Sequence, residues 1–192
     1  MMRTGRSASI LLLLAAMLGA PAWAAPFVVF PEAGRLVSPD GRLEVRDAGR
    51  QGAASEFVGS FHALWLVEVA SGRSRKLCDY LGVAAVAWSG NDFVVITQYV
   101  GKKSSRALVF PTTGAEEPVM LDSSTLIQML PAESRASLRE NDHVFVEALR
   151  LEQGTFYFHV WGYGKHDWNG FQMNCEYGLR EAKVACAQGS KK

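Results

Sequence analysis

Apolar and polar residues alternate with a period of two along most of the chain, and turn-forming residues separate the alternating stretches. This alternation is typical of β-strands that bury one face. Strands are predicted on both sides of a Ser-Pro-Asp-Gly turn at 38–41, with a longer loop at 48–60, and then at 63–69, 73–77, 84–88, 93–99, 107–110, 143–149 and 155–161. The chain is therefore predicted to be mainly β, with antiparallel sheets joined by short turns.

One stretch, at 123–140, has helical spacing instead. Asp122 or Ser123 is suited to cap its N-terminus, and Pro131 is expected to split it into two short helices. The apolar residues with helical spacing are Leu126, Ile127, Leu130 and Leu138. We interpret this stretch as a packing element that covers the edge of a sheet.

The N-terminal residues have the pattern of a secretory signal peptide. Two arginines precede an apolar run at 10–18, and Ala22-Trp23-Ala24 supplies the small residues that a signal peptidase reads. An uncleaved anchor is the weaker alternative, because the run is shorter than the roughly 20 residues that span a bilayer and Pro21 disfavours a continuing helix. We expect a signal peptide at 1–24, cleaved after Ala24.

The charges of the chain nearly cancel, with 20 Lys and Arg against 19 Asp and Glu. Cleavage removes two arginines, so the mature chain at 25–192 has 20 − 2 = 18 basic and 19 acidic residues, a formal charge of −1. The basic residues form no stripe that could neutralise many phosphates, so a nucleic-acid partner is not expected. No later segment is apolar for long enough to span a membrane, so we expect a single β-rich domain that is periplasmic or secreted.

The chain has three cysteines, Cys78, Cys175 and Cys186. The last two flank a segment that is predicted to form two short strands around a turn near 178–182. An oxidising compartment would join neighbouring strands there through a disulfide, which is favoured over pairings of Cys78 because its loop is short. Cys78 would then be a buried free thiol or an intermolecular partner, and no nearby base marks it as a nucleophile.

A strand, a polar turn, two further strands and a Ser/Thr-Gly turn occur in the same order twice, at about 35–78 and 83–121. The separations are 51 residues between Ser38 and Ser89 and 42 residues between Gly72 and Gly114. This order resembles the blades of WD40-like or TolB-like β-propellers, whose repeats are about 40–45 residues long. A closed propeller needs about four blades or more, so the resemblance implies two or three blade-like sheets, not a closed ring, with a C-terminal β part at 142–188.

Two loops are candidate partner-binding sites. The loop at 162–170 is expected to project Tyr163, Lys165, His166 and Trp168. Exposed aromatic side chains supply a large contact area to a protein partner, although Tyr163 and Trp168 could instead pack over the sheet. His166 and Asp167 are a weaker acid–base candidate, because no nucleophile accompanies them. The four histidines have no metal-ligand spacing, so we expect neither a metal nor a cofactor.

The second loop is the predicted hairpin tip at 101–106, which contains Lys102, Lys103, Ser104, Ser105 and Arg106. Hairpin tips face solvent by default, so both serine hydroxyls are expected to be exposed. Neither serine lies in a Gly-x-Ser-x-Gly motif that would favour a catalytic nucleophile.

A signal-bearing protein with incomplete blades and a Ser-Ser loop resembles the periplasmic immunity proteins of type VI secretion amidase effectors. In that family a serine-containing loop enters the catalytic cleft of the toxin. The resemblance implies that Ser104 or Ser105 would donate a hydrogen bond to a catalytic histidine of the target, while the basic residues of the loop meet an acidic rim.

The sequence thus favours a non-enzymatic binding protein, most concretely an inhibitor or immunity protein that blocks a cell-wall hydrolase such as an amidase. One alternative is an envelope assembly module that holds peptides through a propeller-like face. The other, less favoured, is a hydrolase that uses His166 and Asp167.

Overall fold

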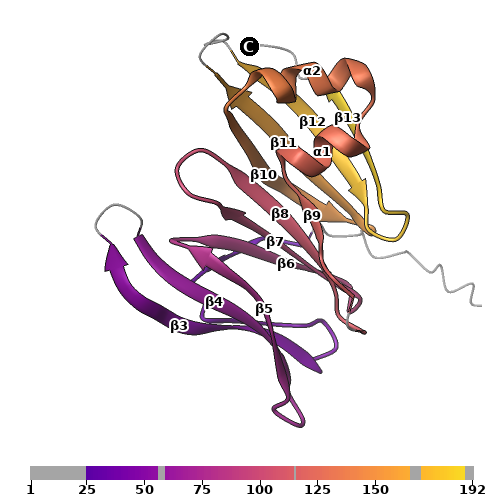
Figure 1. The fold of residues 1–192 in the computed structure, drawn as a ribbon. Coiled ribbons are helices and arrows are strands. Elements are labelled where there is room, and N and C mark those ends of the chain that lie inside the picture. The colour runs from indigo at the N-terminus through magenta and orange to yellow at the C-terminus, as the bar shows by residue number, and fades with distance from the viewer. Residues whose placement is uncertain (1–24, 56–58, 115, 165–169, 189–192) are drawn as a thin grey trace, which may run out of the picture.

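The computed structural model describes residues 25–55, 59–114, 116–164 and 170–188 (Figure 1). The predicted signal peptide at 1–24 lies outside the described residues. The described chain forms three antiparallel sheets and two helices, and none of the three sheets closes on itself. The predicted mainly β fold with two to three open sheets is therefore confirmed.

The N-terminal sheet has the order β2-β3-β4-β5, with β2 at Arg35–Val37, β3 at Leu43–Ser55, β4 at Gly59–Glu68 and β5 at Ser74–Leu81. Gly41 has a φ of 73° in the turn between β2 and β3, a conformation that glycine adopts without strain. The prediction of a loop at 48–60 is wrong for most of that segment. Strand β3 continues through this segment and pairs with β4, with shifts in register that absorb its two glycines.

The central sheet has the order β1-β6-β7-β8-β9. Its strands are β1 at Val28–Phe30, β6 at Ala84–Ser89, β7 at Phe93–Tyr99, β8 at Ser105–Pro111 and β9 at Val119–Leu121. Strand β1 comes from the N-terminal segment and pairs with β6, with Val28 opposite Val86. The sequence predicts no strand there, because alternation cannot be recognised over three residues.

The C-terminal sheet is a meander of β10 at His143–Glu152, β11 at Thr155–Tyr163, β12 at Phe171–Gly178 and β13 at Lys183–Gln188. Cys175 and Cys186 are directly opposite each other in the β12–β13 pairing, and a disulfide joins them. The predicted disulfide is confirmed. Cys78 is a free, half-buried cysteine.

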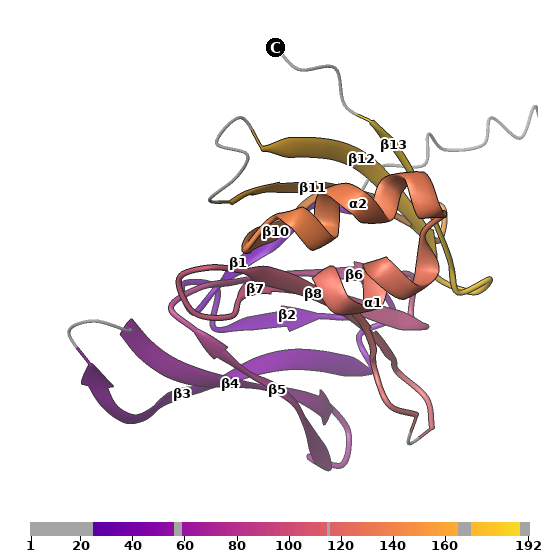
Figure 2. The same cartoon turned by 45° about the horizontal axis from the view of Figure 1, so that its top comes forward.

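The three sheets are stacked as layers with the central sheet in the middle (Figure 2). The side chains of β7 alternate between two apolar cores. Val94 and Ile96 lie in the core between the central and N-terminal sheets, and Val95 lies in the core between the central and C-terminal sheets. Strands that are buried on both faces read as continuous apolar runs, as β7 and β8 do. The central sheet is thus shared by both cores.

Helices α1 at Ser123–Met129 and α2 at Ala132–Glu140 connect the central sheet to the C-terminal sheet (Figure 1). Leu126 of α1, the C-cap residue Leu130 and Leu138 of α2 enter the core beneath the C-terminal sheet. Pro131 separates the two helices as predicted. No helix in the described ranges is long and apolar enough to cross a membrane.

Asp122 is the residue that caps α1. Its carboxylate accepts a hydrogen bond of 2.9 Å from the Thr125 amide and further bonds from the Ser124 and Thr125 hydroxyls. Burial alone would raise the pKa of Asp122, but these hydrogen bonds outweigh burial and hold the pKa below its ordinary value. The charged form of the cap is therefore favoured in the folded protein.

Asp122→Ala should lower the free energy of unfolding by about 1 kcal/mol at pH 7, because the first turn of α1 loses its cap. The folded-state pKa is depressed, so this stability is present above the unfolded pKa of about 3.9. It is lost as the pH falls through the folded pKa, where the variant and the wild type converge. Urea unfolding at several pH values measures the difference, and the exposed Asp142→Ala is the control. A pH-independent difference would contradict the role of the charge.

Candidate binding site

One end of the stack gathers a hairpin from each sheet. The adjoining ends of β3 and β4, of β7 and β8, and of β11 and β12 all lie on the left side in Figures 1 and 2. The two loops singled out in the sequence, at 101–106 and 162–170, belong to the second and third of these hairpins. The fold therefore brings the loop at 101–106 and the strand ends that flank residues 165–169 to one end of the molecule.

Aromatic side chains connect the two hairpins. Cross-strand pairing places His143 opposite Tyr163 and Phe145 opposite Trp161, and the rings stack with centroids 4.5 Å and 4.3 Å apart. Tyr99, at the end of β7, meets the edge of Phe145 at 6.4 Å. Tyr163 is half-buried and stacks on His143, so its ring packs within the row of aromatic side chains more than it projects into solvent. Lys165, His166, Asp167 and Trp168 lie outside the described residues.

The tip of the β7–β8 hairpin is exposed at Lys102 and Lys103. Ser104 is partly exposed, and its hydroxyl donates to the Val100 carbonyl at 3.2 Å, which closes the turn. The tip thus presents two ammonium groups and one accessible hydroxyl in a short connection anchored by β7 and β8.

The expectation that both serine hydroxyls face solvent is wrong for Ser105, which is buried. Its Oγ donates to the Val146 carbonyl at 2.8 Å and accepts from the Val146 amide at 2.7 Å. The Val144 amide donates to the Lys103 carbonyl at 3.2 Å. These bonds supply partners to the Val144 amide and the Val146 peptide group, which lie on the edge of β10 opposite β11. Ser105 therefore joins the central and C-terminal sheets.

Arg106 is the next residue of β8, and it is half-buried. The Gln98 amide is best placed with its oxygen accepting from Nε and Nη2 of Arg106, at 3.2 Å and 3.1 Å, and its nitrogen donating to the Asp79 carbonyl at 2.8 Å. Nη1 of Arg106 contacts the Met120 sulfur at 3.4 Å. Among the described residues, no carboxylate forms an ion pair with this guanidinium.

A groove of about 290 Å³ opens between the N-terminal and central sheets at this end. Its exposed apolar residues are Phe61, Tyr99 and Val100, with exposed fractions of 45%, 46% and 45%. Arg106 also lines the groove. We call Phe61, Tyr99, Val100, Lys102, Lys103 and Ser104 the hairpin-end surface.

A hydrogen-bonded cluster that sequence reasoning missed lies beside this groove. Asp47 accepts from the Tyr80 hydroxyl at 3.2 Å and lies 3.2 Å from Nδ1 of His62, and the His62 ring stacks on Tyr80. Burial, together with the Asp47 charge, raises the pKa of Tyr80. The register of β3, β4 and β5 brings these three residues together. They are far apart in the sequence, so no local motif predicts the cluster. No described hydroxyl or thiol is hydrogen-bonded to His62, and the cluster acts to tie three strands together.

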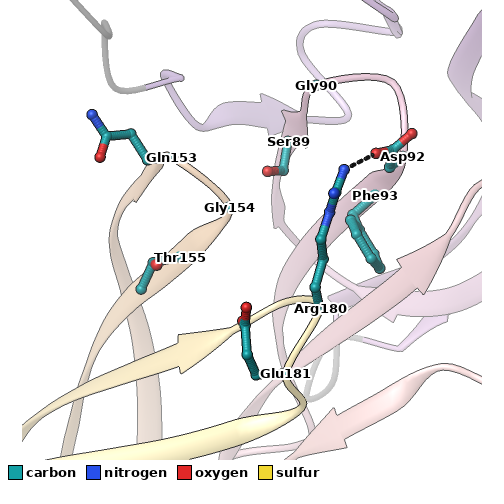
Figure 3. Close-up of a pocket in the computed structure, with 9 residues that line it drawn as sticks. All are labelled: Ser89, Gly90, Asp92, Phe93, Gln153, Gly154, Thr155, Arg180 and Glu181. Carbon is teal, nitrogen blue, oxygen red and sulfur yellow. Dashed lines mark hydrogen bonds and ion pairs between the residues drawn. The ribbon is translucent and has the colours of Figure 1, made fainter.

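A second hollow, of about 410 Å³, lies at the opposite end of the stack (Figure 3). Its lining comes from the turns between β6 and β7, between β10 and β11 and between β12 and β13. Arg180 reaches across to Asp92 in an ion pair of 2.7 Å, as Figure 3 shows. Both partners are exposed, so the pair contributes little to stability. The part of the lining that the structure describes contains no histidine or cysteine that would suit acid–base or nucleophilic chemistry.

Cys78 is the free cysteine among the described residues. Burial raises the pKa of the Cys78 thiol to about 12, so it is protonated at neutral pH. Within the described residues, no group of three or more His, Cys, Asp or Glu side chains could hold a metal ion.

No family model matches the sequence, and no curated protein or solved structure is significantly similar to it.

Ser105→Ala should lower the free energy of unfolding by about 2–3 kcal/mol, because the buried amide and carbonyl of Val146 both lose their partner. Ser104→Ala removes a partly exposed bond and should cost about 0.5 kcal/mol or less. Chemical denaturation of the two alanine variants measures both values. Equal effects at the two serines would contradict the joining role of Ser105.

Proposed function

We propose that this chain is a non-enzymatic binding protein, and most concretely an inhibitor or immunity protein that blocks a cell-wall hydrolase such as an amidase. The observation that carries the proposal is the hairpin-end surface, where exposed apolar side chains and two lysines surround one firmly anchored hairpin tip.

The apolar part of this surface supports a protein partner. Phe61 of β4 and the consecutive residues Tyr99 and Val100 at the end of β7 line one groove, and each is nearly half exposed. Contiguous exposed apolar side chains mark interaction sites more often than single scattered ones do. Tyrosine and phenylalanine also bury a large area at low entropic cost.

The hairpin tip supports insertion into a cleft. Ser104 retains an accessible hydroxyl, whereas the hydroxyl of Ser105 is used within the fold. In the proposed complex the Ser104 hydroxyl turns away from the Val100 carbonyl and donates its hydrogen bond to a catalytic histidine of the hydrolase. Lys102 and Lys103 meet an acidic rim and accelerate association. The resemblance to WD40-like or TolB-like blades and to the immunity proteins stays a prediction.

The compartment agrees with this proposal. The Cys175–Cys186 disulfide is typical of proteins outside the cytoplasm, where oxidising conditions preserve such bonds. We place the protein in the periplasm or outside the cell, after removal of a signal peptide at 1–24. A cell-wall hydrolase works in the same space.

The proposal predicts that the purified protein, used as bait in an extract of the cell envelope, captures a peptidoglycan hydrolase and inhibits it. Ser104→Trp should weaken binding to that hydrolase by about 100-fold or more, about 2.8 kcal/mol, because the indole blocks entry of the tip. Titration calorimetry and a peptidoglycan-hydrolysis assay measure affinity and inhibition.

Ser71→Trp is the matched control, because Ser71 is exposed in the β4–β5 turn at the opposite end. It should bind and inhibit like the wild type. Capture of a partner that is not an enzyme would favour the envelope assembly module instead. Full inhibition by Ser104→Trp would overturn the insertion of this tip.

A further inference from the structure

We propose that the groove beside the hairpin tip recognises an acidic surface segment of the partner protein, in which an apolar side chain stands next to carboxylates. The apolar side chain enters the groove between Phe61 and Tyr99, and a carboxylate binds Arg106. This inference rests on the proposed binding function and specifies the chemistry of the partner.

The size of the groove suits a single side chain. Its volume is about 290 Å³, and one wall contains Phe61, Tyr80 and Leu81 while the other contains Tyr99 and Val100. A dry cavity of about 150 Å³ is enough for a benzene molecule. A phenylalanine or leucine side chain with part of its backbone therefore fills this groove without rearrangement of the walls.

The charge of the groove selects the neighbours of that side chain. In the Arg106 guanidinium, Nη2 donates one hydrogen to Gln98 and Nη1 directs one toward the Met120 sulfur. Each of these nitrogens has a second hydrogen, and no described residue accepts either of them. Asp79, the only carboxylate in the described lining, is paired with Lys76 at 2.7 Å. An arginine that has apolar neighbours and no ion pair binds an incoming carboxylate strongly and in two-pronged geometry.

The rim favours an internal acidic segment over the C-terminus of a peptide. Lys102 and Lys103 are exposed on the tip that ends at the groove, since Gly101 lines it. Together with Arg106 they present three positive charges, which complement several carboxylates and not a single terminal one.

Fluorescence anisotropy tests this with a blocked peptide that contains Glu-Phe-Asp between glycines, added to the full-length protein. We expect saturable binding that weakens as salt is raised. Replacing the phenylalanine of the peptide by alanine, or its acids by glutamine and asparagine, should weaken binding at least about 10-fold, equal to about 1.4 kcal/mol. Absence of binding by the acidic peptide, or equal binding by the neutral one, would overturn the inference.

Arg106→Gln should weaken binding of the same peptide at least about 10-fold, and Arg42→Gln, at an exposed site in the opposite β2–β3 turn, should leave it unchanged. Because Arg106 also holds Gln98, Val100→Glu provides a second variant that leaves those bonds in place and repels the acidic peptide. Wild-type affinity in Val100→Glu, or in folded Arg106→Gln, would contradict the inference. Tighter binding of a peptide with a free C-terminal carboxylate would identify a different occupant.

The two proposals fail separately. Peptide binding without inhibition of any captured hydrolase would reject the proposed function and leave the groove specificity standing. A hydrolase inhibited equally by the wild type, Arg106→Gln and Val100→Glu would reject the groove and leave the inhibitor standing. Concentration-dependent dimerisation that the peptide abolishes would make a second copy of the chain the occupant, against this inference.

Discussion

The reciprocal hydrogen bonds between the Ser105 hydroxyl and the Val146 peptide group are the interaction on which the arrangement of the C-terminal half depends. Strand β10 is an edge strand, and unpaired edge groups are costly when buried and prone to aggregate when exposed. Here the Lys103 carbonyl and the Ser105 hydroxyl satisfy Val144 and Val146, while the Ala25 amide donates to the Leu151 carbonyl at 3.0 Å. One edge is thereby bound at both ends to elements of the other layers.

This joint also explains why the hairpin-end surface has a defined geometry. Ser105 is fixed against β10, so the tip immediately before it has a defined direction and Tyr99 is held against Phe145. A tip that is anchored in this way loses little conformational entropy on binding, which favours the proposed insertion into a cleft. Ser105, one of the two serines expected to contact a partner, instead anchors the tip that carries Ser104.

Local patterns predicted much of the fold, because strand alternation, the Pro131 break and the turn between the two disulfide cysteines are each encoded within a few residues. What could not be predicted depends on contacts distant in sequence. Strand β1 has only three residues and pairs with β6, more than 50 positions later. The partners of Ser105 and the cluster of Asp47, His62 and Tyr80 are likewise fixed by register and sheet stacking. Both candidate loops are predictions from composition, whereas composition does not predict the groove beside one of them.

Amide hydrogen exchange at Val144 and Val146 of the wild-type protein tests the central claim most directly. If Lys103 and Ser105 satisfy the edge of β10, both amides should exchange only on global unfolding, with protection similar to that of the buried strand β7. Exchange of either amide within minutes, as in an unpaired edge strand, would show that β10 is not joined to the central sheet in solution. The anchored tip would then lose its structural basis.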